Sequence, residues 1–253
     1  NSIVLQHPHA TGLARTPSKL GYCSRAQAVQ LIVARKVRVN GALRRDPETA
    51  VHPAKDRIEV EGQLIAASKQ LYLMLNKPRG IVTTAFDEKS RDTVYKYLGD
   101  DLPWVAPVGR LDKASECLLL LTNDSEWAAR ITAPQTHIDK TYHVQIGKIA
   151  DKVLLEALKS GVRTIEGDFL RARHASLLRQ GERNSWLEII LDHGKNRHIR
   201  RMLETLDIEV LRLIRVAIGP LSVGELPKGA TRALRPQEKL SLDRAMLRSP
   251  KSA

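Results

Sequence analysis

The chain has 253 residues, of which 42% are hydrophobic, so it is long enough to bury a sizeable core in one or two domains. It carries 41 Lys and Arg against 28 Asp and Glu, a formal net charge of +13, which is unusual for an enzyme of small-molecule metabolism and favours a polyanionic partner. The sequence shows neither an apolar run of the roughly 18 to 20 residues that a membrane helix needs nor a signal-peptide pattern, and Cys23 and Cys117 form no disulfide or metal-binding pattern. We therefore expect a cytoplasmic protein with reduced thiols and no membrane partner.

The first 45 residues form a strongly basic segment with a predicted helix and a predicted hairpin. The segment holds eight Lys or Arg and no Asp or Glu. Ser24 followed by Gln27 is the pattern of a capping box, which predicts a short amphipathic helix beginning at Ser24. Alternating polar and apolar residues over 36–43, around an Asn-Gly pair, predict a β-hairpin, and residues 56–60 alternate in the same way.

Four cations lie on or beside this predicted helix and hairpin, and no acidic residue occurs in the segment. Such a cationic edge suits the phosphates of a nucleic acid, whereas the alternative is a solvated charged face. The absence of acids favours nucleic-acid binding. The cations are Arg25, Arg35, Lys36 and Arg38.

Residues 20–41, "LGYCSRAQAVQLIVARKVRVNG", and 46–60, "DPETAVHPAKDRIEV", resemble the S4 RNA-binding domain. The resemblance runs from the Ser-Arg start of a helix to a closing strand. Residues 10–19 replace the Arg-Leu-Asp opening that is usual in that family, so the first helix is expected to be short or irregular. The resemblance implies an S4-like RNA-binding domain over residues 13–66.

A polar stretch at residues 66–70 leads into a second predicted domain, residues 70–245. Its strands outnumber its helices and do not alternate with them regularly, which favours an α+β sheet domain over a doubly wound one. The tail from about residue 241 is polar and basic and is expected to fray. The other predicted elements are, in chain order, a strand, turn and strand (71–84), a strand buried on both faces (118–121), a helix capped by Asp124 or Ser125 (126–132), a strand (140–146), a helix between Asp151 and Gly161 (152–160), a buried strand (186–191), a helix (196–206) and a strand (210–219).

Asp112 stands in a loop, "GRLDKASE", directly before the predicted buried strand at 118–121. A carboxylate at the mouth of a rigid scaffold needs a partner, and Arg110, Lys113 or a cation from elsewhere in the fold could provide one. A nearby cation would keep Asp112 ionised and competent as a nucleophile. Taken alone, however, an aspartate in a loop is more often a turn or cap residue.

A second basic stretch, "HGKNRHIRRM" at 193–202, contains four cations and no acid. Helical spacing places Arg197 and either Arg200 or Arg201 on adjoining faces, so one can bind phosphate while another turns inward. Tyr142 lies in the predicted strand 140–146. A tyrosine on an inward face is usually a core residue, but beside a basic groove it can stack on an unpaired base.

Together these segments resemble the RsuA-like family of ribosomal RNA pseudouridine synthases, from about Leu13 to Leu242. The resemblance rests on their order and spacing, and it implies an α+β fold in which the S4 domain is joined to a catalytic domain built on a long mixed, mainly antiparallel sheet with flanking helices. The segments are "LNKPRGIVTT", "VGRLDKASECLLLLTND", "KTYHV", "GKNRHIRRML" and "RLIRVAIGPLSVGELPKGATRAL".

By this resemblance Asp112 is the catalytic aspartate, Tyr142 stacks on the target base and Arg200 is the basic partner of the aspartate. The implied activity is isomerisation of a specific uridine to pseudouridine on a flipped-out nucleotide of ribosomal RNA or a ribosomal subunit precursor. Asp112 either attacks C1′ or assists loss of the 2′ proton to give a glycal, and the sequence leaves both routes open. We expect no cofactor and no metal, because the reaction is an isomerisation. We also expect the protein to be a monomer. The RNA-binding residues expected beyond the first 45 are Lys77, Arg110, Lys140, Lys195, Asn196, Arg197 and Arg201.

Three positions depart from the family pattern. Cys117 and Ser125 stand where Gly is usual, which could alter the tight backbone near the active loop, and His198 replaces a common Gln. Two other functions remain open. One is a non-catalytic S4-type RNA-binding protein, in which Asp112 would be inert. The other is a glycosidase, which needs two carboxylates about 5 to 10 Å apart, and Glu116 is the recognisable candidate for the second acid.

Overall fold

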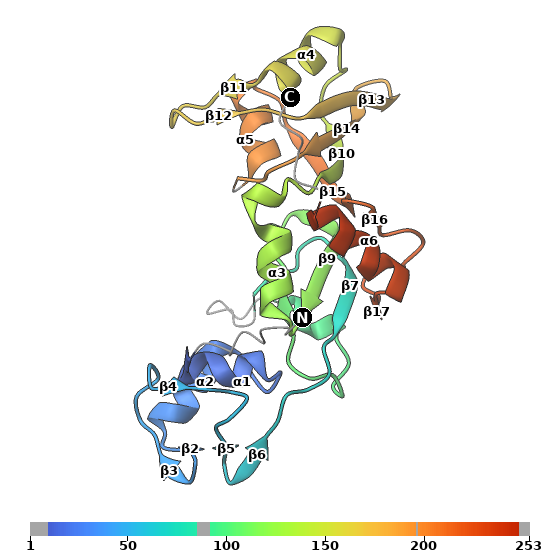
Figure 1. The fold of residues 1–253 in the computed structure, drawn as a ribbon. Helices are drawn as coiled ribbons and strands as arrows, with labels where there is room; N and C mark the ends of the chain where they lie inside the picture. The colour runs from blue at the N-terminus through green and yellow to red at the C-terminus, as the bar shows by residue number, and fades with distance from the viewer. Residues whose placement is uncertain (1–9, 85–91, 196, 248–253) are drawn as a thin grey trace, which may run out of the picture. The chain divides into compact units, whose positions relative to one another are not determined.

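The computed structural model describes residues 10–84, 92–195 and 197–247 (Figure 1). The chain divides into two compact units. The first is built from the residues up to Leu71 together with 99–106 and 122–125, and the second from 72–98, 107–121 and the residues from Glu126 onward. None of the helices in the described ranges is long and apolar enough to cross a membrane.

The first unit packs short helices against a small antiparallel sheet. Its buried core includes Leu13, Ile32, Val37 and Ile58. The helices are η1 (Leu13–Arg15), α1 (Thr16–Lys19) and α2 (Arg25–Val33). The four-stranded sheet has the order β3 (Ala42–Leu43), β2 (Val37–Val39), β5 (Ile58–Val60) and β6 (Gln63–Ile65), and β1 (Thr11–Gly12) pairs separately with β4 (Ala50–Val51).

Local signals in this unit are confirmed by the structure. The Gln27 N–H donates to Ser24 Oγ at 3.1 Å and the Ser24 N–H donates to Gln27 Oε1 at 2.9 Å, which completes the predicted capping box. Asn40 and Gly41 have φ of 52° and 80°, the left-handed conformation that a tight hairpin turn between β2 and β3 requires. The first helix is broken into η1 and the four-residue α1, as the departure at residues 10–19 predicted.

The second unit is built on a large mixed sheet with the strand order β13-β14-β10-β15-β9-β7-β17. β15 and β9 are parallel, whereas the pairs β13–β14, β14–β10, β10–β15 and β7–β17 are antiparallel, so the predicted mixed, mainly antiparallel architecture is confirmed. The strands are β7 (Tyr72–Lys77), β9 (Ser115–Thr122), β10 (Lys140–Ile146), β13 (His174–Gln180), β14 (Ser185–Leu191), β15 (Val210–Ile218) and β17 (Thr231–Ala233), with β8 (Ala106–Pro107) beside β9 and β16 (Leu221–Ser222) beside β15.

Helices flank this sheet over two hydrophobic cores. One core joins β10 and β14 to α4 (Lys152–Ser160) and α5 (His198–Thr205), next to a short hairpin of β11 (Val162–Arg163) and β12 (Phe169–Leu170) (Figure 1). The other surrounds β9 and includes residues of α3 (Ser125–Thr132) and α6 (Pro236–Leu247). The 3-10 turn η2 (Val94–Tyr97) lies between β7 and β8 in the chain, and η3 (Pro134–Thr136) lies between α3 and β10. Every residue of β9 is buried, as predicted for a strand covered on both faces.

Four predicted elements differ from the structure. After β7 the chain forms an isolated bridge between Val82 and Thr93 rather than a second strand. The helix expected from residue 196 begins at His198, and the helix expected from residue 126 begins at Ser125, so Ser125 cannot be its cap. The expected frayed tail is wrong up to residue 247, because α6 buries Leu242 completely.

Candidate active site

The loop that carries Asp112 is fastened to the end of β7 by a buried lysine. Lys77 is fully buried, and its Nζ donates hydrogen bonds to the backbone oxygens of Ser115 at 2.8 Å, Asp112 at 3.2 Å and Pro78 at 3.2 Å. Burial lowers the pKa of Lys77 to about 8, against the opposing attraction of Glu116 and Asp112. The expectation that Lys77 contacts RNA is therefore corrected: its ammonium is occupied inside the protein, where it fixes the Asp112 loop.

Further hydrogen bonds hold the same loop from the segment that follows β7. The Gly80 N–H donates to the Lys113 oxygen at 2.7 Å. Thr83 Oγ1 donates to the Leu111 oxygen at 2.8 Å. Within the loop, the Ser115 N–H donates to the Asp112 oxygen at 2.9 Å. Because backbone groups on both sides of Asp112 are fixed, its Cα–Cβ bond has a defined direction before any substrate is present.

Asp112 and Arg200 lie close together, as the resemblance implied. Arg200 Nε is 4.0 Å from Asp112 Oδ2, and Arg200 Nη2 donates to the Ala114 oxygen at 3.2 Å. The Arg200 side chain is only 14% exposed and the Asp112 side chain 36%, so the guanidinium approaches from the protein side and leaves the carboxylate open to solvent. Arg200 Nε is buried without a hydrogen-bond partner among the described residues. The arrangement gives a charged carboxylate that a substrate can reach.

Tyr142 shares a cavity with Asp112. The cavity has a volume of about 230 Å³. Pockets for larger ligands usually measure about 300 to 1,000 Å³, so this one suits a single planar base. Tyr142 enters from β10, whose next inward residues, Val144 and Ile146, are buried as the alternation predicted. The lining residues are Arg110, Leu111, Asp112, Ser115, Tyr142, Leu191, Gly194, Lys195, Arg197, His198, Ile199 and Leu213.

Positive charge exceeds negative charge around the carboxylate. Burial lowers the pKa of Arg200, Asp112 opposes this shift, and the neighbouring cations Arg197 and Arg79 add to it. Neither Arg197 nor Arg79 forms an ion pair with any residue in the described ranges, and the same holds for Arg110 at the cavity wall. One carboxylate thus faces several cations, which is the charge balance expected where a phosphate chain binds.

Glu116 is occupied by two cations and is unavailable as a second catalytic acid. Its carboxylate accepts from Arg212 Nε at 3.0 Å and Nη2 at 2.9 Å, and from Lys228 Nζ at 2.9 Å, while remaining almost fully buried. Burial alone would raise the pKa of Glu116, but the hydrogen bonds from Arg212 and Lys228 bring it below its usual value. A carboxyl group held ionised in this way cannot serve as the proton donor of a glycosidase.

The second basic stretch separates into free and paired cations. Arg197 lines the cavity with a left-handed backbone, φ 50°, directly before α5. Lys195 also lines the cavity, but its Nζ is bound to Asp168 at 2.8 Å, and Arg201 Nη2 is bound to the same carboxylate at 2.7 Å. Asn196, another predicted RNA contact, lies outside the described residues. Lys195 and Arg201 therefore have protein partners that the basic run did not predict.

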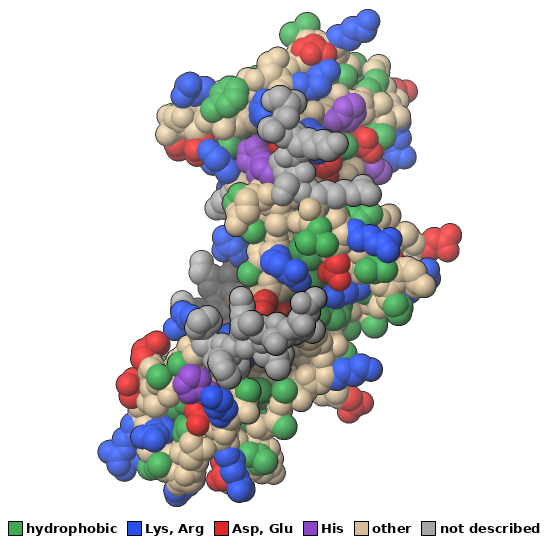
Figure 2. Space-filling model, viewed as in Figure 1, with side chains coloured by type: hydrophobic (Ala, Val, Ile, Leu, Met, Phe, Trp, Pro, Cys, Tyr) green, Lys and Arg blue, Asp and Glu red, His purple; other side chains and the backbone are tan. Residues whose placement is uncertain are grey.

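Cations of the first unit show the same division. Arg25 pairs with Glu48 at 3.4 Å and Lys36 with Glu61 at 2.6 Å, so acids from beyond the first 45 residues neutralise part of the basic segment. Arg38 donates to the Gly41 oxygen at 2.9 Å, whereas Arg35 is exposed and has no ion-pair partner among the residues described. Figure 2 shows Lys and Arg side chains interspersed with acidic ones over the visible face rather than gathered in one patch.

Lys140 precedes Tyr142 by two residues on β10 and is half-buried. Desolvation lowers the pKa of its ammonium, and nearby Arg215 adds to the shift. Arg215 is itself buried, with Nε donating to the Leu118 oxygen at 2.9 Å. Lys140 is thus less accessible to a phosphate chain than Arg110 or Arg197.

Cys117 has a backbone conformation that favours glycine. It lies within β9 at φ 88°, where a side chain is strained. The thiol is buried, and burial raises its pKa to about 11, so it stays protonated and unreactive. Position 117, where the family usually has Gly, therefore has a positive φ that Gly adopts without strain. Ser125, the other such position, is accommodated as the first residue of α3.

Comparison with known proteins gives one consistent result. Residues 71–205 match the family described as RNA pseudouridylate synthase, and residues 18–58 match the S4 domain. An uncharacterised RNA pseudouridine synthase of Rickettsia prowazekii, strain Madrid E, is 39% identical over 218 residues, which cover 86% of this chain and 91% of that protein. Ribosomal large subunit pseudouridine synthase B of Bacillus subtilis, strain 168, is 35% identical over 227 residues, which cover 89% of this chain and 93% of that protein. The crystal structure of a pseudouridylate synthase aligns with a TM-score of 0.65 at 27% identity, over 92% of this chain and 99% of that one.

Proposed function

The chain belongs to the RNA pseudouridylate synthase family and carries an S4 domain, and from this premise we propose that it isomerises a specific uridine of ribosomal RNA with Asp112 as the catalytic residue. The observation that carries the proposal is the cavity that Asp112 and Tyr142 share, with Arg200 4.0 Å from the carboxylate. The name of the Bacillus subtilis relative supports a ribosomal substrate. The net charge of +13 suits a polyanion of that kind.

The chemistry requires one bond to break and another to form at C1′ of the ribose. In one route the Asp112 carboxylate attacks C1′ as the bond to N1 breaks, and the resulting ester bond breaks when C5 joins C1′. In the other the bond to N1 breaks as Asp112 removes the 2′ proton to give a glycal, and the proton returns to C2′ when C5 joins C1′. In both, the uracil turns within the cavity, C1′ joins C5, the C5 proton leaves and N1 gains a proton. Because the atoms of substrate and product are the same, the reaction calls for no cofactor or metal.

Arg200 and Tyr142 have distinct proposed roles beside the aspartate. The guanidinium of Arg200 stabilises the carboxylate anion from the protein side, where water is scarce. Tyr142 stacks on the detached uracil and keeps it from escaping while it turns, and its hydroxyl is the candidate base for the C5 proton. Both side chains come from regular elements, α5 and β10, which supports a preorganised site.

RNA binding must also supply the energy to extrude the target uridine, which costs a few kcal/mol. We propose that residues 13–66 act as an RNA-binding domain and residues 70–245 as the catalytic domain, with the unpaired cations Arg35, Arg110 and Arg197 as phosphate contacts. The protein would act as a monomer on ribosomal RNA or a ribosomal subunit precursor in the cytoplasm.

The decisive experiment compares wild-type protein with Asp112→Asn on ribosomal RNA labelled with tritium at C5 of uridine. Isomerisation releases the C5 tritium to water. We expect the wild type to release it and the variant to release at least about a thousandfold less, with RNA affinity unchanged within about twofold, because the substituted side chain is a nucleophile and not a phosphate contact. Equal release by the two proteins would overturn the catalytic role of Asp112.

The same assay separates the alternatives. If the protein were an S4-type RNA-binding protein without catalysis, the wild type would bind the RNA but would release no tritium. A glycosidase would liberate free uracil, which chromatography of the small-molecule fraction detects. Mapping pseudouridine in ribosomal RNA from cells with and without the protein would then identify the target uridine.

A further inference from the structure

The β11–β12 hairpin brings two acidic side chains, Glu166 and Asp168, to the basic stretch at 193–202, of which Lys195 lines the cavity. Its turn is tight: the Gly167 N–H donates to the Thr164 oxygen at 2.9 Å, the Thr164 N–H to the Asp168 oxygen at 2.8 Å, and Gly167 adopts φ 89°. At the base of the hairpin, the Phe169 ring packs so closely on Gly161 that a Cβ there would lie 2.3 Å from a ring carbon. The hairpin is therefore a rigid carrier for Glu166 and Asp168.

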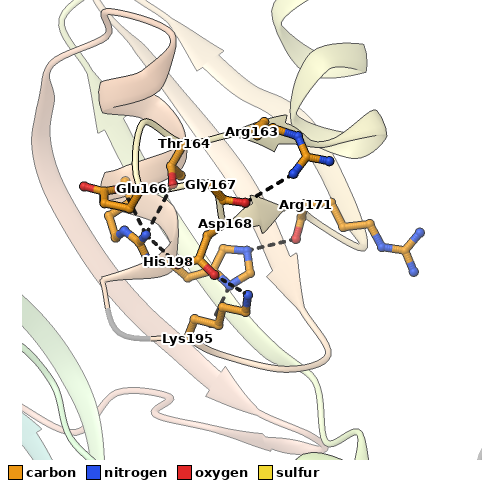
Figure 3. Close-up of polar contacts among 9 residues, drawn as sticks. Arg163, Thr164, Glu166, Gly167, Asp168, Arg171, Lys195 and His198 are labelled. Carbon is orange, nitrogen blue, oxygen red and sulfur yellow. Dashed lines mark hydrogen bonds and ion pairs between the residues drawn. The ribbon is translucent and has the colours of Figure 1, made fainter.

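Asp168 joins this hairpin to the basic stretch that forms part of the cavity wall. Its two carboxylate oxygens accept from Lys195 Nζ at 2.8 Å and from Arg201 Nη2 at 2.7 Å, and Glu166 accepts from Arg201 at 3.2 Å (Figure 3). Two cations and two acids thus balance at this edge. Ion pairs as exposed as these contribute little to folding stability, so stability is a weak reason for them to exist.

A buried histidine fixes the same segment independently. The Lys195 N–H donates to His198 Nδ1 at 3.4 Å, and His198 Nε2 lies 3.1 Å from the Arg171 oxygen, at the end of the hairpin (Figure 3). Burial lowers the pKa of His198 to about 4, so the ring is neutral and can accept at Nδ1 while donating at Nε2. The imidazole of His198 thus binds the backbone N–H of Lys195, and Asp168 binds the ammonium of Lys195.

We propose that Asp168 is a positioning residue that controls where the RNA backbone binds. By occupying Lys195 of the cavity wall, and Arg201 of the same basic stretch, it leaves Arg110 and Arg197 as the cations of the wall without an ion-pair partner among the described residues. Phosphates then bind at Arg110 and Arg197, which places the extruded uridine at Asp112. The inference rests on the proposed function. Without the acid, Lys195 and Arg201 would attract phosphates as well, and RNA would bind more tightly but in positions that do not present the uridine to the carboxylate.

The test measures RNA affinity as a function of salt, together with single-turnover tritium release, for wild type and Asp168→Asn. Each additional phosphate contact steepens the dependence of log K on log salt by about 0.7 to 0.9. Asp168→Asn frees Lys195 and leaves Arg201 with Glu166, so the slope should steepen by at least about 0.7 to 0.9. The rate constant of the bound complex should fall roughly ten- to hundredfold, since displacement by about 1 Å has effects of that size. Tighter binding with slower turnover is the expected combination.

Two variants and a control make the result specific. Asp168→Glu should resemble the wild type more than Asp168→Asn does, because the carboxylate is retained. Glu166→Gln should change the salt dependence less than Asp168→Asn, because Arg201 keeps Asp168 at 2.7 Å and Lys195 keeps its partner. Glu156→Gln is the matched control: it removes the same charge and releases Lys159, its partner at 2.6 Å on α4, away from the cavity. It should leave turnover unchanged. Thermal unfolding of each variant identifies any loss of fold.

The proposal is overturned if Asp168→Asn keeps the wild-type salt dependence, or if it binds RNA more tightly yet turns over at the wild-type rate. Either result would make the Asp168 contacts ordinary surface ion pairs. Failure of the proposed function is recognised separately. In that case the wild type releases no tritium, while its binding and salt dependence can still be measured.

Discussion

Replacing the buried lysine with a similar apolar side chain, Lys77→Met, should separate the stability of the fold from the function of the loop. The ammonium donates to three backbone oxygens around Asp112, so its loss frees the loop that directs the carboxylate. In the variant, the Asp112 oxygen still accepts from the Ser115 N–H at 2.9 Å. The oxygens of Pro78 and Ser115 lose the lysine as a donor, so up to two oxygens become unsatisfied. Unsatisfied buried oxygens cost about 1 to 3 kcal/mol each.

An opposing gain makes the net stability change small. Burial lowers the pKa of Lys77 from 10.5 to about 8, a penalty on the charged form of about 3 kcal/mol in the folded protein. Methionine fills a similar volume without that penalty. We therefore expect Lys77→Met to change the free energy of unfolding at pH 7 by no more than about 3 kcal/mol, while turnover falls by about a hundredfold because the carboxylate is no longer held in place.

The pH dependence of stability gives a test that is independent of activity. With a pKa of about 8 in the folded chain and 10.5 in the unfolded chain, Lys77 binds fewer protons when folded between these values. Its penalty is complete below about pH 8 and disappears as pH rises toward 10.5, so wild-type stability gains up to about 3 kcal/mol from this residue across that window. Urea unfolding at several pH values should show this gain in the wild type and not in Lys77→Met. Parallel curves for the two proteins would refute the assignment of Lys77 as a desolvated ammonium.

Two further substitutions test the surroundings of the loop. Glu116→Gln should destabilise the fold by about 1 to 3 kcal/mol at pH 7, because it removes the ionised partner of Arg212 and Lys228. The pKa of Glu116 in the folded protein is lowered from 4.5, so the stability difference between wild type and variant should be complete above about pH 4.5 and shrink as pH falls through the folded pKa. Urea unfolding at a series of acidic pH values measures this difference. A difference that does not change with pH would contradict the prediction. Cys117→Gly should be more stable than Cys117→Ala by about 1 kcal/mol, because φ is 88° there, although Ala is the more stabilising residue at ordinary strand positions. Thermal unfolding of both variants measures the order, and the reverse order would show that the conformation is not strained.

Features that depend on neighbouring residues could be predicted from the sequence. The capping box of α2 needs only Ser24 and Gln27, and the turn between β2 and β3 needs only Asn40 and Gly41, so their structures agree with the patterns. The burial of Leu118–Leu121 in β9 likewise followed from four consecutive leucines, whereas the burial of Ser115, Glu116 and Thr122 in the same strand had no such signal. The three proposed catalytic residues were identified through resemblance, because no local rule connects an aspartate at 112 with an arginine at 200.

Features that depend on distant partners could not be predicted. Lys77 looks like any exposed cation in the sequence, and its burial becomes visible only when the oxygens of Asp112 and Ser115 are placed around it. The tail from residue 241 has a polar composition, but Leu242 enters the core that contains Trp127, Met246 packs against that core and the Trp127 Nε1–H donates to Asp243 Oδ1 at 2.8 Å. Tertiary contacts override composition in both cases, as they commonly do for short polar segments.

The distribution of ion pairs explains how a chain with a charge of +13 can still be selective. A uniformly basic surface would bind any RNA, because phosphate contacts carry no sequence information. Here acids neutralise cations at Arg25, Lys36, Lys195 and Arg201, while Arg110 and Arg197 at the cavity have no ion-pair partner among the described residues. In the proposed function, phosphates that bind Arg110 and Arg197 lie beside Asp112, and repulsion between that carboxylate and phosphate favours RNA that presents a sugar and a base to it. The proposed function therefore attributes selectivity for the extruded nucleotide to which cations at the cavity are unpaired, as well as to the net charge.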